Sequence, residues 1–146
     1  MKPKDVVIRE FRMDDYENVL RLWDEAEIHY RPKGRDSRKW IEKELKSGQA
    51  IFLVAEADAR IVGVVLGTHD GRKGWINRLA VVKDARRQNI ASKLVTAVEM
   101  RLNTIGIDVI ACMIENENTI SMKFFKKLGY IKSPVEYFSK RQSWDS

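Results

Sequence analysis

Apolar residues recur along this chain at two spacings, which together predict a mixture of strands and helices. Residues 6–11 alternate and are rich in β-branched side chains, which is typical of a strand. Residues 14–29 carry apolar side chains at intervals of three and four, and a second helix is predicted from Asp36 or Ser37 to Gly48. The side chains expected to be buried on these helices are Tyr16, Val19, Leu20, Trp23, Ala26, Trp40, Ile41 and Leu45.

Three further apolar segments predict an antiparallel part of a sheet. They span residues 51–56, 60–68 and 75–82, and short connections containing Gly and Asp join them. A helical pattern over residues 89–105 then leads to a near-continuous apolar run at 108–114. We expect this run to be a central, buried strand parallel to 75–82, because a helix forms the crossover between them.

The last third of the chain completes the predicted architecture. Asn118 is the expected N-cap of a final helix, and residues 135–140 are the expected last strand. The order of elements therefore predicts a mixed α/β (α+β) fold, in which helices flank one mixed sheet.

The turn between residues 82 and 90 has the features of a phosphate site. A strand that turns into a helix leaves backbone N–H groups without partners at the positive end of the helix dipole. Arg86, Arg87 and Lys93 add positive charge around it. The alternative is a solvated basic turn that binds nothing.

Composition places the chain among ordinary globular proteins. Its 146 residues are 44% hydrophobic and 33% charged, which predicts a single domain over residues 1–146. No run is long enough for a membrane span, and residues 1–5 lack the apolar region of a signal peptide. The single cysteine, Cys112, excludes an internal disulfide and predicts a cytoplasmic location. The net charge of +6 suits an anionic ligand, but the basic residues are scattered among 21 acids, so we expect no nucleic acid partner.

Two segments carry a resemblance to a known family. Arg86-Arg87-Gln88-Asn89-Ile90-Ala91 resembles the acyl-CoA-binding motif R/Q-x-x-G-x-G/A of the GNAT superfamily of N-acetyltransferases. Asn89 replaces the middle glycine, and Asn is the residue that best tolerates a left-handed backbone after Gly. The later family motif N-x-x-A-x-x-x-Y-x-x-x-G-F is similar to the segment 118–130, where the matching residues are Asn118, Ser121, Phe125, Gly129 and Tyr130.

The resemblance implies a GNAT-like fold with a splayed parallel strand pair, and the transfer of an acetyl group from acetyl-CoA to an amine. It implies acetyl-CoA as the acetyl donor and no metal. The implied donor-binding residues are Leu79, Ala80, Val81, Arg86, Arg87, Gln88, Asn89, Ile90, Ala91, Ser92, Asn118 and Phe125. The acceptor is expected to be a small-molecule or peptide amine, bound by a monomer or homodimer that associates with no membrane.

The acid–base residues that the resemblance implies are altered in this chain. The position of the usual strand carboxylate is Asn77, which can orient a water but cannot act as a base. Glu115 is the nearest acid to the motif, and Glu56 and His69 are weaker candidates. Phe125 replaces the tyrosine that usually acts as the general acid. These losses keep open an alternative, a non-catalytic acyl-CoA-binding or regulatory module.

Overall fold

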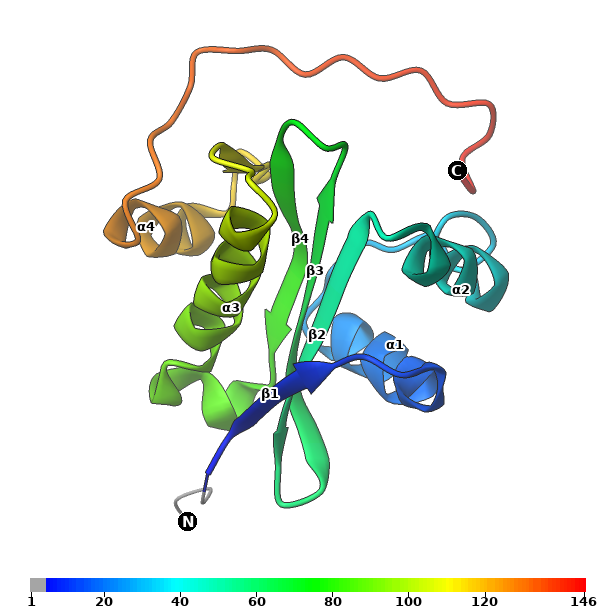
Figure 1. The fold of residues 1–146 in the computed structure, drawn as a ribbon, viewed down its shortest axis with the longest axis vertical. Helices are drawn as coiled ribbons and strands as arrows, with labels where there is room; N and C mark the ends of the chain where they lie inside the picture. Colours follow the sequence, from blue (N-terminus) through cyan, green and yellow to red (C-terminus); the bar gives the residue numbers. More distant parts are fainter. Residues whose placement is uncertain (1–4) are drawn as a thin grey trace.

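The computed structural model describes residues 5–146, except for the side chains of residues 86–88. Its strands form one sheet in the order β1-β2-β3-β4-β5 (Figure 1). The strands are antiparallel to their neighbours except for the parallel pair β4 and β5. Their bounds are Val7–Glu10 for β1, Ala50–Ala57 for β2, Arg60–His69 for β3, Gly74–Val81 for β4 and Ile110–Cys112 for β5. The predicted mixed α/β class is confirmed.

Helices cover both faces of the sheet, α1 and α2 on one and α3 and α4 on the other (Figure 1). Short 3-10 helices precede α1 and α3. The bounds are Met13–Asp15 for η1, Tyr16–Glu25 for α1, Arg38–Ser47 for α2, Lys83–Gln88 for η2, Ile90–Thr104 for α3 and Thr119–Lys127 for α4.

Glycines in the sheet allow α3 to pack closely against it. A Cβ atom at Gly67 would lie 2.7 Å from Val98 Cγ1, and one at Gly74 would lie 2.7 Å from Leu102 Cδ1. The strand surface is therefore flat under the helix, and the α3 side chains Ile90, Leu94, Val95, Val98 and Leu102 are fully buried. Burial of this stripe fixes the position of the N-terminus of α3 relative to β4.

On the opposite face of the sheet, the structure agrees with the predicted helices α1 and α2 in part. Ser37 is the N-cap of α2, where its hydroxyl accepts a hydrogen bond from Trp40 N at 3.3 Å, and Gly48 ends the helix with a φ of 76°. The expected burial of Trp40 is wrong, because its side chain is 47% exposed. Leu20, Ala26 and Leu45 are only partly buried, whereas Leu22 belongs to the core.

An ion-pair cluster ties the start of the chain to the sheet. Arg9 donates from Nη1 to Asp15 Oδ2 at 2.8 Å and from Nε to Glu56 Oε2 at 2.6 Å. Arg12 N also donates to Asp15 Oδ2, at 2.8 Å. These hydrogen bonds lower the pKa of the largely buried Asp15, which is therefore held ionised in the folded protein.

The last part of the chain differs from the expectation. The run at 108–114 gives only the short edge strand β5, whose residues are half-buried, and residues 135–140 form no strand. Pro134 removes a ladder donor beside that segment, and three-residue β5 offers little edge for pairing. The chain instead runs extended from α4 to the side of α2, with Phe138 89% exposed (Figure 1).

Candidate active site

The parallel pair β4 and β5 is joined over a short stretch only. Gly74 pairs with Ile110, Trp75 with Ala111 and Ile76 with Cys112, and β5 ends there. Strand β4 continues to Val81. A gap between two parallel strands is a place where a ligand can contact backbone groups, because ligands of α/β sheets bind where neighbouring strands separate.

A β-bulge lies in this continuing part of β4. Ala80 pairs with Val64 and Asn77 pairs with Leu66, so Arg78 and Leu79 together lie opposite Val65. Arg78 has a φ of 47°, in the left-handed region. A bulge interrupts the hydrogen-bond ladder and redirects backbone groups and side chains, and bulges are frequent next to active sites.

Asn77 and Arg78 both lie on the α1/α2 face of the sheet. The cross-strand partner of Ile76 is Gly67, which faces Val98 of α3, so the next residue, Asn77, points the other way. Asn77 Nδ2 donates to Thr68 Oγ1 at 3.1 Å. This bond fixes the side-chain amide and leaves its Oδ1 as the atom that can accept a hydrogen bond.

The turn into α3 has the expected left-handed residue. Asn89 has φ 59° and ψ 24°, and its side chain makes no capping hydrogen bond at the start of α3. The backbone N–H groups of the first turn, at Ile90, Ala91 and Ser92, therefore receive no side-chain cap from Asn89, and the dipole there favours an anion. The side chains of Arg86, Arg87 and Gln88, which the motif places here, lie outside the described part of the structure.

A buried ion pair joins the bulge to the α1–α2 connection. Arg78 donates from Nε to Asp36 Oδ1 at 3.1 Å and from Nη2 to Asp36 Oδ2 at 2.6 Å. Arg31 N donates to the same carboxylate at 2.6 Å, and Tyr16 Oη donates to the Asp36 carbonyl at 2.8 Å. This pair was not predictable from the sequence, since 42 positions separate its members and no motif contains either one.

Glu44 of α2 is a second candidate residue that no sequence motif contains. Burial raises the pKa of its carboxyl, and Asp36 raises it further, while Arg78 and Arg35 lower it. Glu44 is thus a half-buried carboxyl in the charged surroundings of the bulge. Its place one turn after Trp40 on α2 was predictable from the sequence, but the charges that surround it depend on tertiary packing.

The other predicted catalytic residue, Glu115, lies apart from these groups. It is exposed, in the connection between β5 and α4. Asn118 ends that connection, and its Oδ1 accepts a hydrogen bond from Ser121 N at 3.0 Å, which confirms it as the N-cap of α4.

Phe125 is buried in an aromatic group at the end of α4. Its ring lies edge-on to Phe124 and to Tyr130, each with a centroid separation of 5.1 Å. Tyr130 Oη donates to Glu99 Oε2 at 2.7 Å, and burial together with this carboxylate raises the pKa of Tyr130 strongly. Tyr130 is therefore a poor proton donor at neutral pH.

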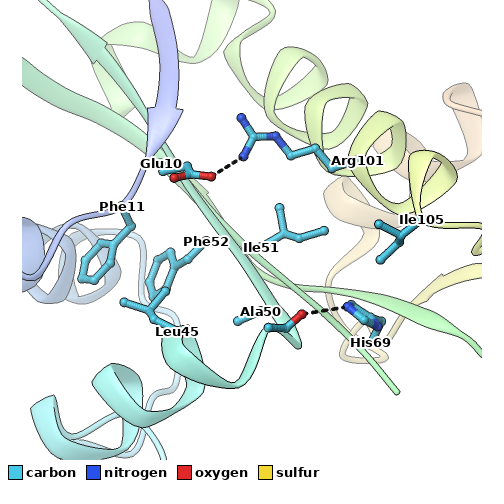
Figure 2. A pocket seen from close by; sticks show the side chains of 10 residues that line it. Glu10, Phe11, Leu45, Ala50, Ile51, Phe52, His69, Arg101 and Ile105 are labelled. Atoms are coloured by element: carbon cyan, nitrogen blue, oxygen red, sulfur yellow. Dashed lines mark hydrogen bonds and ion pairs between the residues drawn. The ribbon is translucent and has the colours of Figure 1, made fainter. Parts of the chain in front are cut away.

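A cavity of about 390 Å³ lies away from the splayed strands, where β2 extends past β1 (Figure 2). Figure 2 shows the ion pair between Arg101 and Glu10 on one side of it and His69 on another. His69 Nδ1 accepts a hydrogen bond from Gly71 N at 3.1 Å, and Nε2 lies 3.2 Å from the Gly48 carbonyl oxygen. Both ring nitrogens of His69 are thus engaged with neighbouring backbone groups. The carboxylate of Glu56, the other weaker candidate, is paired with Arg9.

Comparison with known proteins identifies the family. The family model described as the acetyltransferase (GNAT) family matches residues 8–130. The chain belongs to the GNAT acetyltransferase family. An acetyltransferase from Pectobacterium atrosepticum is 37% identical over 123 residues, which cover 84% of this chain and 86% of the relative.

Solved GNAT structures share the fold. AAC(6')-Iy in complex with the bisubstrate analog CoA-S-monomethyl-acetylneamine has a TM-score of 0.79 and 20% identity, and the match covers 94% of this chain and 99% of that one. The PaiA N-acetyltransferase of Thermoplasma acidophilum, in complex with coenzyme A, has a TM-score of 0.79 and 18% identity, with 90% and 93% covered.

This GNAT protein is an acetyl-CoA-dependent N-acetyltransferase, with acetyl-CoA as the acetyl donor. The described residues fit such a donor, because a helix start without a side-chain cap follows a bulged strand and the short helix η2. The parallel partner of that strand also ends early. Within residues 5–146 no group of three or more His, Cys, Asp or Glu residues is arranged to hold a metal ion. None of the described helices combines the length and the apolar character needed to cross a bilayer.

Proposed function

We propose that this GNAT enzyme binds acetyl-CoA between β4 and the N-terminus of α3 and acetylates an amine that approaches from the α1/α2 face. The observation that carries the proposal is the bulge at Arg78 and Leu79, next to the point where β5 ends. The bulge would thus lie between the donor, at the N-terminus of α3, and the acceptor, on the α1/α2 face.

The donor would be held mainly by backbone groups. The amides from residues 86 to 92 would bind the pyrophosphate, with Ala91 giving a close approach and Arg86, Arg87 and Gln88 contributing from η2. Leu79, Ala80 and Val81 would present backbone groups to the pantetheine arm and the thioester. Asn118 and Phe125, from the other side of the gap, would line the same arm.

The reaction forms a C–N bond between the acceptor nitrogen and the acetyl carbon while the C–S bond of the donor breaks, and CoA leaves as the thiol. The acceptor ammonium must first lose a proton, since the ordinary pKa of an alkylamine is about 10. We propose Glu44 as the residue that takes this proton, because its carboxyl is half-buried and is influenced by the charges of Asp36 and of Arg78 in the bulge. Asn77 would orient the amine or a water through Oδ1, and Glu115 remains an alternative base on the β5 side.

The remaining proposals concern the domain organisation, the cellular compartment, the oligomeric state and the acceptor. We propose a single domain that works in the cytoplasm as a monomer or homodimer, on a small-molecule or peptide amine. The lone Cys112, which is half-buried and free, suits a reducing compartment.

A pH–rate profile tests the proposed roles. The release of CoA thiol is followed with a panel of amines, at saturating acetyl-CoA, for the parent and for Glu44→Gln. We expect Glu44→Gln to lower kcat by about a hundredfold and to remove an ionisation from the acidic limb of the profile. Glu42→Gln, an exposed change on the same helix, serves as the control. An unchanged acidic limb in Glu44→Gln would exclude Glu44 and leave Glu115 or water as the base.

A further inference from the structure

A second cavity lies between the α1–α2 connection and the C-terminal segment. Its volume is about 520 Å³, and it is open to solvent. The residues that line it are Gly34, Arg35, Trp40, Tyr137, Ser139, Lys140, Arg141, Gln142 and Ser146. It belongs to the α1/α2 face, and its residue Arg35 directly precedes Asp36, the partner of Arg78 at the bulge.

The charged side chains that line this cavity are all cationic. Arg35, Lys140 and Arg141 line it, and its described lining contains no Asp or Glu. Arg141 uses one nitrogen to donate to the main-chain oxygen of Ser146 at 2.5 Å. Burial lowers the pKa of Arg35, and so do the neighbouring charges of Arg78, Arg141 and Arg31, whereas Asp36 raises it. An added anion would therefore interact favourably with Arg35.

Aromatic side chains complete the cavity. Trp40 and Tyr137 both line it and both are largely exposed, which contradicts the burial that helical spacing predicts for Trp40. A flat apolar surface beside a cluster of cations can contact the carbon skeleton of a ligand while the cations bind its anionic group.

The C-terminal segment is held in place on the α1–α2 connection. Arg31 Nη1 donates to the Trp144 carbonyl at 2.9 Å. A Cβ atom at Gly34 would clash with the Asp145 carbonyl oxygen, so the two backbones are in direct contact at this glycine. Two of the three cations therefore reach the cavity only because the segment is anchored there.

We propose that this cavity binds a carboxylate or phosphate group carried by the amine that the enzyme acetylates. The inference rests on the proposed function in placing the acceptor on the α1/α2 face. It names the acceptor class as amines with an anionic group, and it disfavours polyamines and other polycations, which the same three positive charges would repel.

The acceptor class is tested with four amines that share an aminoethyl group: propylamine, β-alanine, 2-aminoethyl phosphate and 1,3-diaminopropane. We expect kcat/KM for at least one anionic amine to exceed that for propylamine about tenfold or more, and the diamine to be the poorest substrate. The better of the two anionic amines identifies the group as carboxylate or phosphate. Arg35→Gln should remove most of the preference, whereas Lys33→Gln, in the same connection but outside the cavity, should retain it.

Binding of inorganic phosphate tests the site without catalysis. In NMR titrations we expect saturable shifts of the Arg35 Nε–H and the Trp40 indole N–H, with the Trp40 shift lost in Arg35→Gln and kept in Lys33→Gln. Acetylation without preference, together with no saturable shift, would overturn the anion site and leave the transferase intact. Saturable phosphate binding without acetylation of any amine would retain the anion site and refute the proposed acceptor approach.

Discussion

The guanidinium of Arg78 and the carboxylate of Asp36 form a two-point ion pair in which the side chains are 13% and 3% exposed. Arg78 occupies the bulge of β4, and Asp36 lies just before α2. One interaction thus fixes the α1–α2 connection against the strand that we propose to hold the thioester. The distance between the acceptor side and the donor side is thereby set by a buried pair rather than by a flexible loop.

Loss of this pair is expected to destabilise the fold. Asp36→Asn leaves the Arg78 charge buried without its counter-ion, and breaking a buried pair typically costs about 3–5 kcal/mol. Urea unfolding followed by circular dichroism measures the change. Glu42→Gln removes one partner of the exposed pair with Lys46 and should change the free energy of unfolding by less than about 1 kcal/mol. Similar values for the two variants would contradict the structural role of the Arg78–Asp36 pair.

The left-handed conformation of Asn89 predicts which residues position 89 accepts. Asn89→Gly should retain both stability and CoA affinity. Asn89→Val should lower the free energy of unfolding by about 1–2 kcal/mol, because a β-branched residue strains at a φ of 59°. Asn103→Val, at an exposed helical position of α3, should be nearly neutral, since Asn and Val have similar helix propensities. Equal losses at positions 89 and 103 would show that the backbone of Asn89 is not left-handed in solution.

The lowered pKa of the Asp15 carboxyl predicts how the free energy of unfolding depends on pH. Its folded pKa is lowered by Arg9, so its contribution is fully present above the unfolded pKa of about 3.9 and is lost as the pH falls through the lower folded value. Asp15→Asn should therefore be less stable than the parent at pH 7, and the difference should shrink below about pH 4. Chemical unfolding at several pH values measures this, with Glu17→Gln as an exposed control. A difference that stays constant down to pH 2 would contradict the ion pair.

Phe125→Tyr asks whether the ring of residue 125 lies against the donor sulfur. The change adds one hydroxyl to a buried ring and should leave CoA affinity within severalfold and raise, or at least preserve, turnover. A hydroxyl without a partner would instead cost about 1–3 kcal/mol. Steady-state acetylation and thermal unfolding, measured on both proteins, decide between these outcomes. A large loss of stability with no change in rate would make Phe125 a core residue only.

Local sequence signals were sufficient for most of the fold. The spacing that buries Ile90, Leu94, Val98 and Leu102 of α3 and the glycine at residue 48 act within a few residues, and both lie where they were predicted. Of the two predicted starts of α2, Ser37 is the cap. Ile105, which the same spacing predicts to be buried, is 56% exposed. The tolerance of Asn89 for a left-handed backbone is likewise a property of one side chain, and it was predictable for that reason.

The features that failed prediction depend on distant partners. A strand at residues 135–140 requires an edge to pair with, and β5 is too short to provide one. Trp40 lies on the helical face that spacing marks as buried, but the C-terminal segment leaves a cavity beside it. The pairing of Arg78 with Asp36 and the charges around Glu44 arise only when the α1–α2 connection folds against β4, and no local pattern encodes that contact.

Binding of CoA by Ala91→Glu is the most direct measurement of the central claim, that the start of α3 holds the donor. Isothermal titration calorimetry is performed on the parent, on Ala91→Glu and on Thr96→Glu, which places the same charge farther along α3. We expect the Thr96 variant to bind CoA within about threefold of the parent, because exposed charges that far from the phosphates are largely screened. Ala91→Glu should remain folded by circular dichroism and lose CoA binding by at least about a hundredfold. Parent-like affinity in folded Ala91→Glu would contradict the placement of the donor at these residues.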